Sequence, residues 1–346
     1  MENNTMRTIT LGKTDIKVLQ NAFGALPIQR VSVECAVDLL RKAYDGGIRF
    51  FDTARMYTDS EEKLGKAFFG MREKIYIATK TTALTAEDFQ KDLEISLETL
   101  QTDYIDLYQF HNPPFCPKPC DGSGLYEAAV KAKAQGKIRH IGITNHRPAV
   151  AKEAILSGLY ETLQFPFCYL AGELDLEIVK LCKENDVGFI AMKALSGGLI
   201  TNAYAACAWL MQFDNVLPIW GIQKAEELEE ILSFNSCVPS MDENTAAAIE
   251  KDRRELFGSF CRACGYCMPC PVGIKINNCA RMSQLIRRSP SAQWLSEENQ
   301  AMMLNIEKCI GCGVCATRCP YGLNPPKLLK KNLEDYKQIL AGNIKL

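Results

Sequence analysis

The chain has 346 residues, 47% hydrophobic and 23% charged, which is typical of a globular protein with room for a barrel-sized domain and a smaller one. Its 40 basic and 41 acidic side chains leave a formal net charge of −1, which argues against general affinity for nucleic acid or an anionic membrane. Neither a secretory signal nor an apolar run of membrane-spanning length is found, so we expect a cytoplasmic protein.

Short β-rich apolar segments alternate with helical patterns in the first two thirds of the chain. We expect strands at 18–25, 48–54, 75–80, 105–111, 138–145, 162–167, 188–194 and 216–222. Between them, segments such as 33–47, 86–100 and 176–185 repeat apolar residues every three or four positions, which indicates amphipathic helices. Glycine or asparagine near the ends of several of these segments is typical of helix termination.

This alternation predicts a parallel (β/α)8 TIM barrel. An open doubly wound sheet is the alternative, but it requires a glycine-rich phosphate loop after its first strand, where this sequence reads FGALPIQR. We place the barrel domain at 1–240 and a second domain at 241–346, where the alternation stops. The second domain is expected to contain helices at 241–257, 291–305 and 325–340.

Sixteen cysteines are unusual, and in a reducing compartment clustered cysteines more often bind metal than form disulfides. Two groups, CRACGYCMPCP and CIGCGVCATRCP, follow residue 260. Their members are Cys261, Cys264, Cys267, Cys270, Cys309, Cys312, Cys315 and Cys319. Spacing by two residues lets successive thiolates face one metal centre, and the glycines allow a tight loop. The other eight cysteines are dispersed and are expected to be small buried side chains.

These groups predict an α-rich, ferredoxin-like domain with two 4Fe–4S clusters. A proline after the last cysteine is typical of bacterial two-cluster ferredoxins, in which three cysteines of one run and the last of the other hold each cluster. That pattern joins Cys261, Cys264 and Cys267 with Cys319, and Cys309, Cys312 and Cys315 with Cys270. The first run departs from it by having two residues, not three, before its last cysteine. Two four-cysteine zinc sites are the alternative, although zinc ribbons separate their cysteine pairs more widely.

Polar residues lie at the carboxyl ends of three predicted strands, where TIM barrels place their catalytic groups. Asp52 lies near the end of the second strand, with Tyr57 in the segment that follows. Lys80 ends the third strand and His111 ends the fourth. Because these ends share one rim of a barrel, we expect the four side chains to meet in one cleft. Each residue alone is more often structural, so the prediction depends on the set.

The segments FDTARMYTDSEEKLG, IATK, TDYIDLYQFHNP, GKIRHIGITN and AMKALSGG resemble the aldo-keto reductases, eight-stranded barrels that reduce carbonyls with NADPH. The resemblance covers about residues 6–235, and the tail resembles the iron–sulfur branch of that family. It implies that Thr144, Asn145 and Gln164 contact the nicotinamide carboxamide and that 221–230 lies near the adenosine phosphate.

The sequence departs from the family pattern at the cofactor site. Met192 stands where many relatives stack a tyrosine on the nicotinamide, and Lys193 follows it. The basic cluster expected for a 2′-phosphate is reduced to Lys224, with Glu226 and Glu227 nearby. The cofactor is therefore expected to be either NADP(H) or NAD(H).

The four rim residues suit carbonyl reduction. Hydride addition leaves an alkoxide that must receive a proton, and a free tyrosine, with a pKa of about 10, is a poor acid at neutral pH. A neighbouring Lys80 ammonium is expected to lower the pKa of Tyr57, while Asp52 orients the lysine. His111 is expected to donate a hydrogen bond to the carbonyl oxygen. Tyr57 is thus interpreted as the proton donor.

Both halves together predict an oxidoreductase of small carbonyl or alcohol substrates. A nicotinamide transfers a hydride, whereas iron–sulfur clusters transfer single electrons, so the clusters are expected to be structural or to exchange electrons with a partner such as a ferredoxin or flavoprotein. One alternative is a ferredoxin-dependent reductase with a different barrel cofactor, such as a flavin. Another is a non-catalytic electron-transfer protein that retains the barrel.

Overall fold

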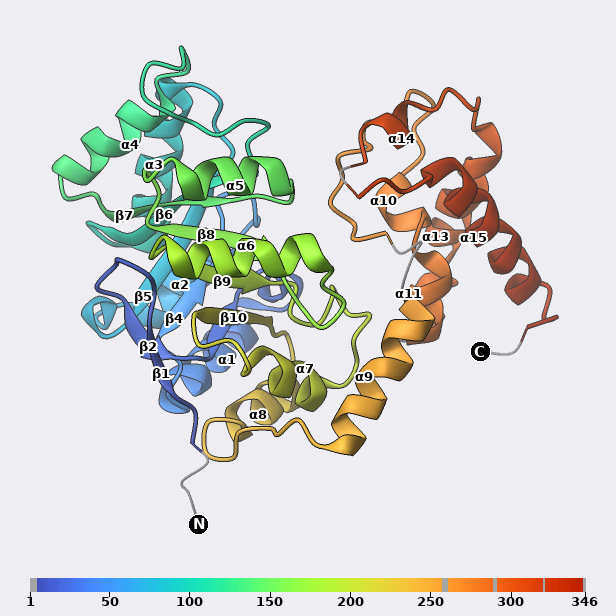
Figure 1. The fold of residues 1–346 in the computed structure, drawn as a ribbon, viewed down its shortest axis with the longest axis horizontal. Coiled ribbons are helices and arrows are strands. Elements are labelled where there is room, and N and C mark those ends of the chain that lie inside the picture. The colour runs from blue at the N-terminus through green and yellow to red at the C-terminus, as the bar shows by residue number, and fades with distance from the viewer. Residues whose placement is uncertain (1–4, 257–260, 289–290, 320, 345–346) are drawn as a thin grey trace. The chain divides into compact units, whose positions relative to one another are not determined.

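The computed structural model describes residues 5–256, 261–288, 291–319 and 321–344 (Figure 1). The chain forms two compact units. The first comprises Met1–Ala194 and Ala203–Asp242, and the second comprises Leu195–Asn202 and Glu243–Leu346. In the described part of the chain, none of the helices combines the length and apolar character needed to cross a membrane.

The first unit is a closed barrel in which every neighbouring pair of strands is parallel. Its strands are β3 (Ala22–Gly24), β4 (Phe50–Asp52), β5 (Tyr76–Thr81), β6 (Ile105–His111), β7 (Ile138–Thr144), β8 (Thr162–Pro166), β9 (Gly188–Met192) and β10 (Val216–Gly221). They run in chain order around the barrel, which closes between β10 and β3. The predicted (β/α)8 TIM barrel is confirmed.

Helices connect the strands and bury their apolar faces against the barrel. They are α1 (Val33–Asp45), α2 (Ser60–Phe68), α3 (Ala86–Leu100), α4 (Leu125–Ala134), α5 (Pro148–Leu156), α6 (Glu173–Glu184), α7 (Ala203–Leu210) and α8 (Ala225–Ser233), with 3₁₀ turns η1 (Pro27–Arg30) and η2 (Arg72–Lys74). Side-chain hydroxyls cap the N-termini of α1 and α3. Ser32 accepts a hydrogen bond from the Cys35 amide, and Thr85 accepts one from the Asp88 amide. The helices expected in the barrel from the three-to-four-residue repeat are therefore present.

The predicted strand at 18–25 is wrong, because the structure divides it into two strands. β2 (Lys17–Leu19) pairs antiparallel with β1 (Thr8–Thr10), and β3 then enters the barrel. Gln20 and Asn21 lie between them and are buried. The Gln20 amide donates to the carbonyls of Phe213 and Val216, both at 2.6 Å, so the break places a buried side-chain donor against the backbone near the start of β10.

The hairpin of β1 and β2 contributes to the apolar core of the barrel. Ile9 and Val18 belong to the same buried cluster as Phe50, Ala78 and Leu107, which lie on successive barrel strands. The strands begin near this cluster, so their carboxyl ends, which bear the predicted polar set, lie at the other rim.

The second unit is helical. Its elements are α9 (Glu243–Leu256), α10 (Ile276–Cys279), α11 (Met282–Arg288), α12 (Ser291–Trp294), α13 (Glu297–Leu304), η3 (Asn305–Lys308), α14 (Val314–Thr317) and α15 (Pro325–Leu340). Figure 1 shows α10, α11, α13 and α15 grouped together, and they share a buried core that includes Ile276, Met282, Met303 and Leu329. The predicted helix at 325–340 is confirmed, and α9 forms residues 243–256 of the helix predicted at 241–257, whose last residue lies outside the described residues.

A single helix at 291–305 is wrong, because the chain breaks between α12 and α13. Ser296 accepts a hydrogen bond from the Asn299 amide at 3.4 Å and so begins a new helix. The unit also includes the short segment Leu195–Asn202, where Arg281 donates to the carbonyl oxygens of Ser196 at 3.4 Å and Gly197 at 3.2 Å.

Candidate functional site

A buried ion pair lies at the carboxyl rim of the barrel. Lys80 Nζ donates to both carboxylate oxygens of Asp52, at 2.7 and 2.8 Å, and to the carbonyl oxygen of Thr53 at 2.5 Å. Only 1–2% of either residue is exposed. Burial raises the pKa of Asp52 and lowers that of Lys80, and the ion pair opposes both changes.

Tyr57 and His111 lie next to this pair. Lys80 Nζ is 5.3 Å from the centroid of the Tyr57 ring, and the Tyr57 and His111 ring centroids are 5.8 Å apart with the rings nearly perpendicular. Both aromatic residues are only partly buried, in contrast to the ion pair. The structure therefore brings the four predicted residues together, with Tyr57 and His111 on the more accessible side.

The pKa of Tyr57 is not lowered in this structure, contrary to the expectation based on the neighbouring Lys80. Burial raises the pKa of the Tyr57 phenol above its ordinary value, and the charge of Asp52 raises it further. The reason is geometric, since the Lys80 ammonium is hydrogen-bonded to Asp52 and lies near the tyrosine ring. The hydroxyl consequently stays protonated throughout the physiological pH range.

His111 is uncharged at neutral pH. Burial lowers its pKa to about 3, and the positive charge of Lys80 contributes to that change. Within the part of the chain that is described, its Nδ1 atom has no hydrogen-bond partner. A neutral imidazole carries one N–H group and can donate it to a carbonyl oxygen.

Gln109 belongs to this site although the sequence-based prediction omits it. It is the register partner of Lys80 across β5 and β6, and its amide donates to Gln164 Oε1 at 3.0 Å and to Asp52 Oδ1 at 3.5 Å. Gln164 donates in turn to Asp52 Oδ2 at 3.4 Å. The two-residue period of a strand, which puts Gln109 on the same side as His111, was the signal that could have found it.

A second group outside the prediction fixes the segment that carries Tyr57. Buried Glu61 forms an ion pair with Arg55 and accepts hydrogen bonds from Thr79 at 2.6 Å and Ser96 at 2.8 Å. The Thr53 and Ser60 hydroxyls, on either side of Tyr57, lie 2.8 Å apart. Both ends of the Tyr57 segment are therefore held by buried polar contacts.

The residues that the resemblance assigns to the nicotinamide lie on the neighbouring part of the rim. Thr144 ends β7 and is the register partner of Gln164 on β8. Asn145 follows, and its amide donates to the Pro113 carbonyl at 2.9 Å while its oxygen accepts from the Arg147 amide at 2.8 Å. Thr144, Asn145 and Gln164 are buried and adjacent, and their roles stay predictions.

The remaining predicted cofactor residues follow β9 and β10. Met192 ends β9, and Lys193 has a left-handed backbone with φ of 59°. Lys224 is exposed and precedes α8. Glu227 accepts hydrogen bonds from the amides of Gln223 at 2.9 Å and Lys224 at 3.2 Å. A carboxylate therefore already caps the helix end where a phosphate is expected, and it opposes further negative charge there.

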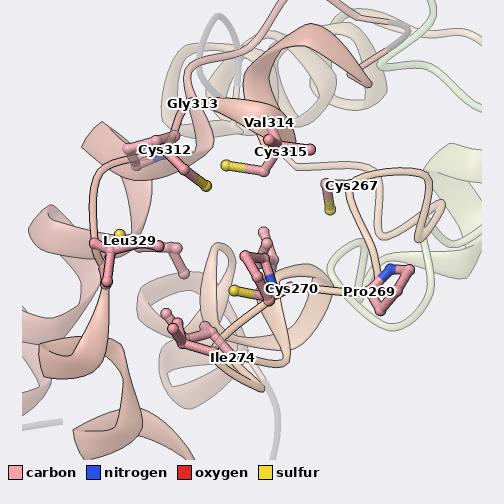
Figure 2. Close-up of a pocket in the computed structure, with 15 residues that line it drawn as sticks. Cys267, Pro269, Cys270, Ile274, Cys312, Gly313, Val314, Cys315 and Leu329 are labelled. Atoms are coloured by element: carbon pink, nitrogen blue, oxygen red, sulfur yellow. The ribbon is translucent and has the colours of Figure 1, made fainter.

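The clustered cysteines line two cavities of the second unit. Cys261, Cys264, Cys267 and Cys319 line one. Cys270, Cys309, Cys312 and Cys315 line the other, together with Cys267. Figure 2 shows Cys267, Cys270, Cys312 and Cys315 arranged around the second cavity. Among the described residues, no group of three or more His, Cys, Asp or Glu side chains is placed to hold a single metal ion.

Cysteines that line the same cavity affect one another's pKa. Burial chiefly raises the pKa of Cys261, and the nearby Cys264 and Cys319 raise it further. Burial likewise raises the pKa of Cys315, with added effects from Cys309 and Cys312. Of the two prolines that follow the cysteine runs, Pro271 borders the second cavity, and Pro320 lies outside the described residues.

Most dispersed cysteines are at least partly buried, as expected, but the prediction is wrong for three of them. Cys116, Cys182, Cys207 and Cys279 are buried and Cys168 is partly buried. Cys35, Cys120 and Cys237 are exposed. They lie at the start of α1, in a turn and after α8.

Comparison with known families agrees with both parts of the chain. The model of the aldo/keto reductase family matches residues 20–207, and the model of a 4Fe-4S dicluster domain matches residues 260–324. The second match favours iron–sulfur chemistry over the zinc alternative.

Individual relatives match the barrel part. The chain is 29% identical over 280 residues to L-galactose dehydrogenase from Arabidopsis thaliana, a match that covers 69% of this chain and 87% of that protein. It is 33% identical over 185 residues to aldo-keto reductase YhdN from Bacillus subtilis. That match covers 48% of this chain and 54% of that protein. A crystal structure of an aldo-keto reductase from Klebsiella pneumoniae in complex with NADPH has a TM-score of 0.62 at 21% identity, covering 71% of this chain and 94% of that one. This last likeness concerns the fold.

Proposed function

Because the chain belongs to the aldo/keto reductase family, within its iron–sulfur branch, we propose that its barrel reduces a small carbonyl compound with NADPH or NADH, or oxidises the corresponding alcohol. The observation that carries the proposal is the position of Tyr57 and His111 beside the buried Lys80–Asp52 pair. The complex of the Klebsiella pneumoniae relative with NADPH supports a nicotinamide cofactor.

The four residues divide the chemistry among them. The nicotinamide, when bound, supplies the hydride that adds to the carbonyl carbon. Neutral His111 donates its N–H group to the carbonyl oxygen and so places the substrate. Tyr57, which stays protonated, then gives its proton to that oxygen. Lys80, beside the Tyr57 ring, stabilises the resulting phenolate. Asp52 holds the lysine in place, and Gln109 holds Asp52.

Six residues are proposed to hold the nicotinamide cofactor. They are Thr144, Asn145, Gln164, Met192, Lys193 and Lys224. Their positions at the carboxyl ends of β7, β8, β9 and β10, on the rim that carries Tyr57, support the assignment. Lys224 is the single basic side chain among residues 221–230, so NAD(H) and NADP(H) both stand as cofactors.

The second unit is proposed to hold two 4Fe–4S clusters. One is assigned to Cys261, Cys264, Cys267 and Cys319, and the other to Cys270, Cys309, Cys312 and Cys315. The composition of the two cavities supports this division, and sets of four thiolates are the donors that such clusters require. The clusters, when bound, would transfer single electrons. We propose that the barrel domain spans 1–240 and the cluster-binding domain spans 241–346. We also propose that the protein is cytoplasmic and that a redox partner protein exchanges electrons with the clusters.

A Tyr57→Phe variant tests the barrel function. Anaerobically purified protein is supplied with NADPH or NADH and a panel of aldehydes and ketones, and consumption of the reduced nicotinamide is followed. Loss of a general acid is expected to lower kcat by about 10²–10⁴-fold. Tyr104→Phe is the matched control, because a phenyl ring preserves the contacts of Tyr104 with Arg72 and Arg139. Undiminished turnover by Tyr57→Phe would remove the basis of the proposal.

A further inference from the structure

The two cysteine-lined cavities differ in their exposure. Cys309 and Cys312, on the second cavity, are exposed. On the first cavity, Cys261, Cys264 and Cys319 are partly buried and Cys267 is buried. A group held in the second cavity is therefore the more accessible from solution.

Exposed apolar side chains line the second cavity together with its cysteines. Ile310, between Cys309 and Cys312, is 67% exposed and lines the cavity. Gly311 and Gly313 have positive φ angles of 67° and 73°, which allow the chain to turn closely on both sides of Cys312. We call the exposed or partly exposed apolar residues that border this cavity the Ile310 face: Pro269, Pro271, Val272, Ile310, Val314 and Pro326.

Every charged residue next in sequence to a residue lining this cavity is a lysine. Lys275, Lys308, Lys327 and Lys330 are these neighbours, and all four are exposed. The nearest acidic residue in the sequence, Glu307, is in an ion pair with Lys337 at 2.6 Å. The chain as a whole has a formal net charge of only −1, so these exposed lysines make a local excess of positive charge in the segments that line the second cavity.

We propose that the Ile310 face binds an acidic one-electron carrier protein. The inference rests on the proposed iron–sulfur function of the second cavity. A small apolar surface whose flanking residues carry charge of one sign suits a transient redox encounter, in which complementary charge raises the association rate and apolar contact fixes the geometry. Two copies of the chain do not fit together through this face on both sides, because the lysines of one would repel those of the other.

The test measures binding by calorimetry, with anaerobically purified full-length protein. The probe is an acidic plant-type 2Fe–2S ferredoxin, and a basic mitochondrial cytochrome c is the carrier of opposite charge. We expect ferredoxin to bind, with a Kd that weakens about 10-fold or more between about 50 and about 300 mM salt. Cytochrome c is expected not to bind.

Variants locate the binding surface. Lys275→Glu combined with Lys308→Glu is expected to weaken ferredoxin binding about 10-fold or more. Lys91→Glu combined with Lys131→Glu makes the same change of net charge on exposed positions of α3 and α4, and is expected to leave the Kd unchanged. Ile310→Asn, which alters no charge, is expected to weaken binding about 3- to 10-fold. Iron and sulfide contents equal to those of the unaltered protein show that the cysteine centre is intact in each variant.

Several outcomes would overturn the inference. Iron-loaded protein that reduces carbonyls but does not bind ferredoxin contradicts the docking surface alone and leaves the proposed function standing. Equal weakening by both lysine pairs, or equal binding of cytochrome c, also contradicts it. Protein isolated without iron and sulfide contradicts the assignment of the cysteine cavities, and the docking surface with it.

Discussion

Lys80 Nζ lies 2.7 and 2.8 Å from the two carboxylate oxygens of Asp52, and the pair is shielded from solvent beneath Tyr57. Removing one partner of a buried pair leaves an uncompensated charge, which typically costs about 3–5 kcal/mol of folding free energy. We therefore expect Lys80→Met to lower both the free energy of unfolding and kcat. The measurements are denaturant unfolding and carbonyl-dependent NAD(P)H oxidation.

The double variant Asp52→Asn with Lys80→Met separates the two effects. It removes both charges, so we expect most of the lost stability to return. Activity is expected to stay low, because no cation remains to stabilise the Tyr57 phenolate. Recovery of activity together with stability would contradict the role assigned to Lys80.

The folded state holds His111 neutral down to a pKa of about 3, well below its ordinary value of 6.5. As the pH falls below 6.5, the unfolded chain binds a proton at His111 and the folded chain does not, so the protein loses stability progressively towards pH 3. We expect His111→Gln to lack this part of the acid destabilisation. Denaturant unfolding of both proteins between about pH 4 and about pH 7 measures the difference. If the free energy of unfolding depended on pH in the same way for both proteins, His111 would not contribute to the acid destabilisation.

Glu61 is expected to act on catalysis through the segment that carries Tyr57. Glu61→Gln removes the charge that holds Arg55, at a buried position that also accepts hydrogen bonds from Thr79 and Ser96. We expect kcat to fall about 10-fold from misplacement of Tyr57, with a loss of about 1–3 kcal/mol in stability. Glu62→Gln is the control, since Glu62 is exposed and pairs with Lys66 on the surface of α2. Loss of stability with unchanged kcat would make Glu61 a structural residue alone.

His140 lies between two carboxylates in the first unit, Glu161 at 2.7 Å and Asp15 at 2.6 Å. Burial alone would lower its pKa, but the hydrogen bonds to Glu161 and Asp15 raise it overall. The stabilisation that protonated His140 gives the folded state is therefore complete below the ordinary pKa of 6.5. It is lost as the pH rises through the raised pKa of the folded state. We expect His140→Gln to destabilise the protein most near about pH 6 and least near about pH 9, as measured by denaturant unfolding.

Alanine variants of the cysteines test how the eight ligands divide between two centres. Cys309→Ala is expected to remove about half of the bound iron, because it disables one of two clusters. Adding Cys270→Ala should remove no more iron, since both residues are assigned to one cluster. Adding Cys319→Ala instead should remove nearly all of it. Cys279→Ala, a buried thiol on α10 outside both sets, is the control. The opposite pattern for Cys270 and Cys319 would show that each run holds its own cluster.

The barrel could be predicted because apolar residues repeat with different periods in its strands and its helices. β6, for example, begins and ends at the predicted residues. The first strand was less predictable, since the apolar run 18–25 conceals Gln20 and Asn21, whose carbonyl partners, such as Phe213 and Val216, are distant in sequence. The break before α13 was readable in principle, because Ser296 precedes two glutamates in the pattern of a helix start.

The candidate site, like the fold, could be predicted from the sequence only in part. Residue types at strand ends predicted Asp52, Tyr57, Lys80 and His111, which the fold brings together. The pKa of Tyr57 could not be predicted in the same way, because it depends on burial and on the direction in which the Lys80 ammonium points. Gln109 was within reach of strand periodicity, whereas the contacts of Glu61 with Thr79 and Ser96 follow only from the packing of α2 and α3 against the barrel.

The segment Leu195–Asn202 belongs to the second compact unit although barrel residues precede and follow it. The chain thus passes from one unit to the other at residues 194–195, 202–203 and 242–243. No single cleavage can release both units whole, and a fragment that stops at 242 keeps a piece of the second unit without the Arg281 contacts to Ser196 and Gly197. Separate production of the iron–sulfur part and the barrel therefore calls for a grafted loop in place of 195–202, rather than a shortened gene.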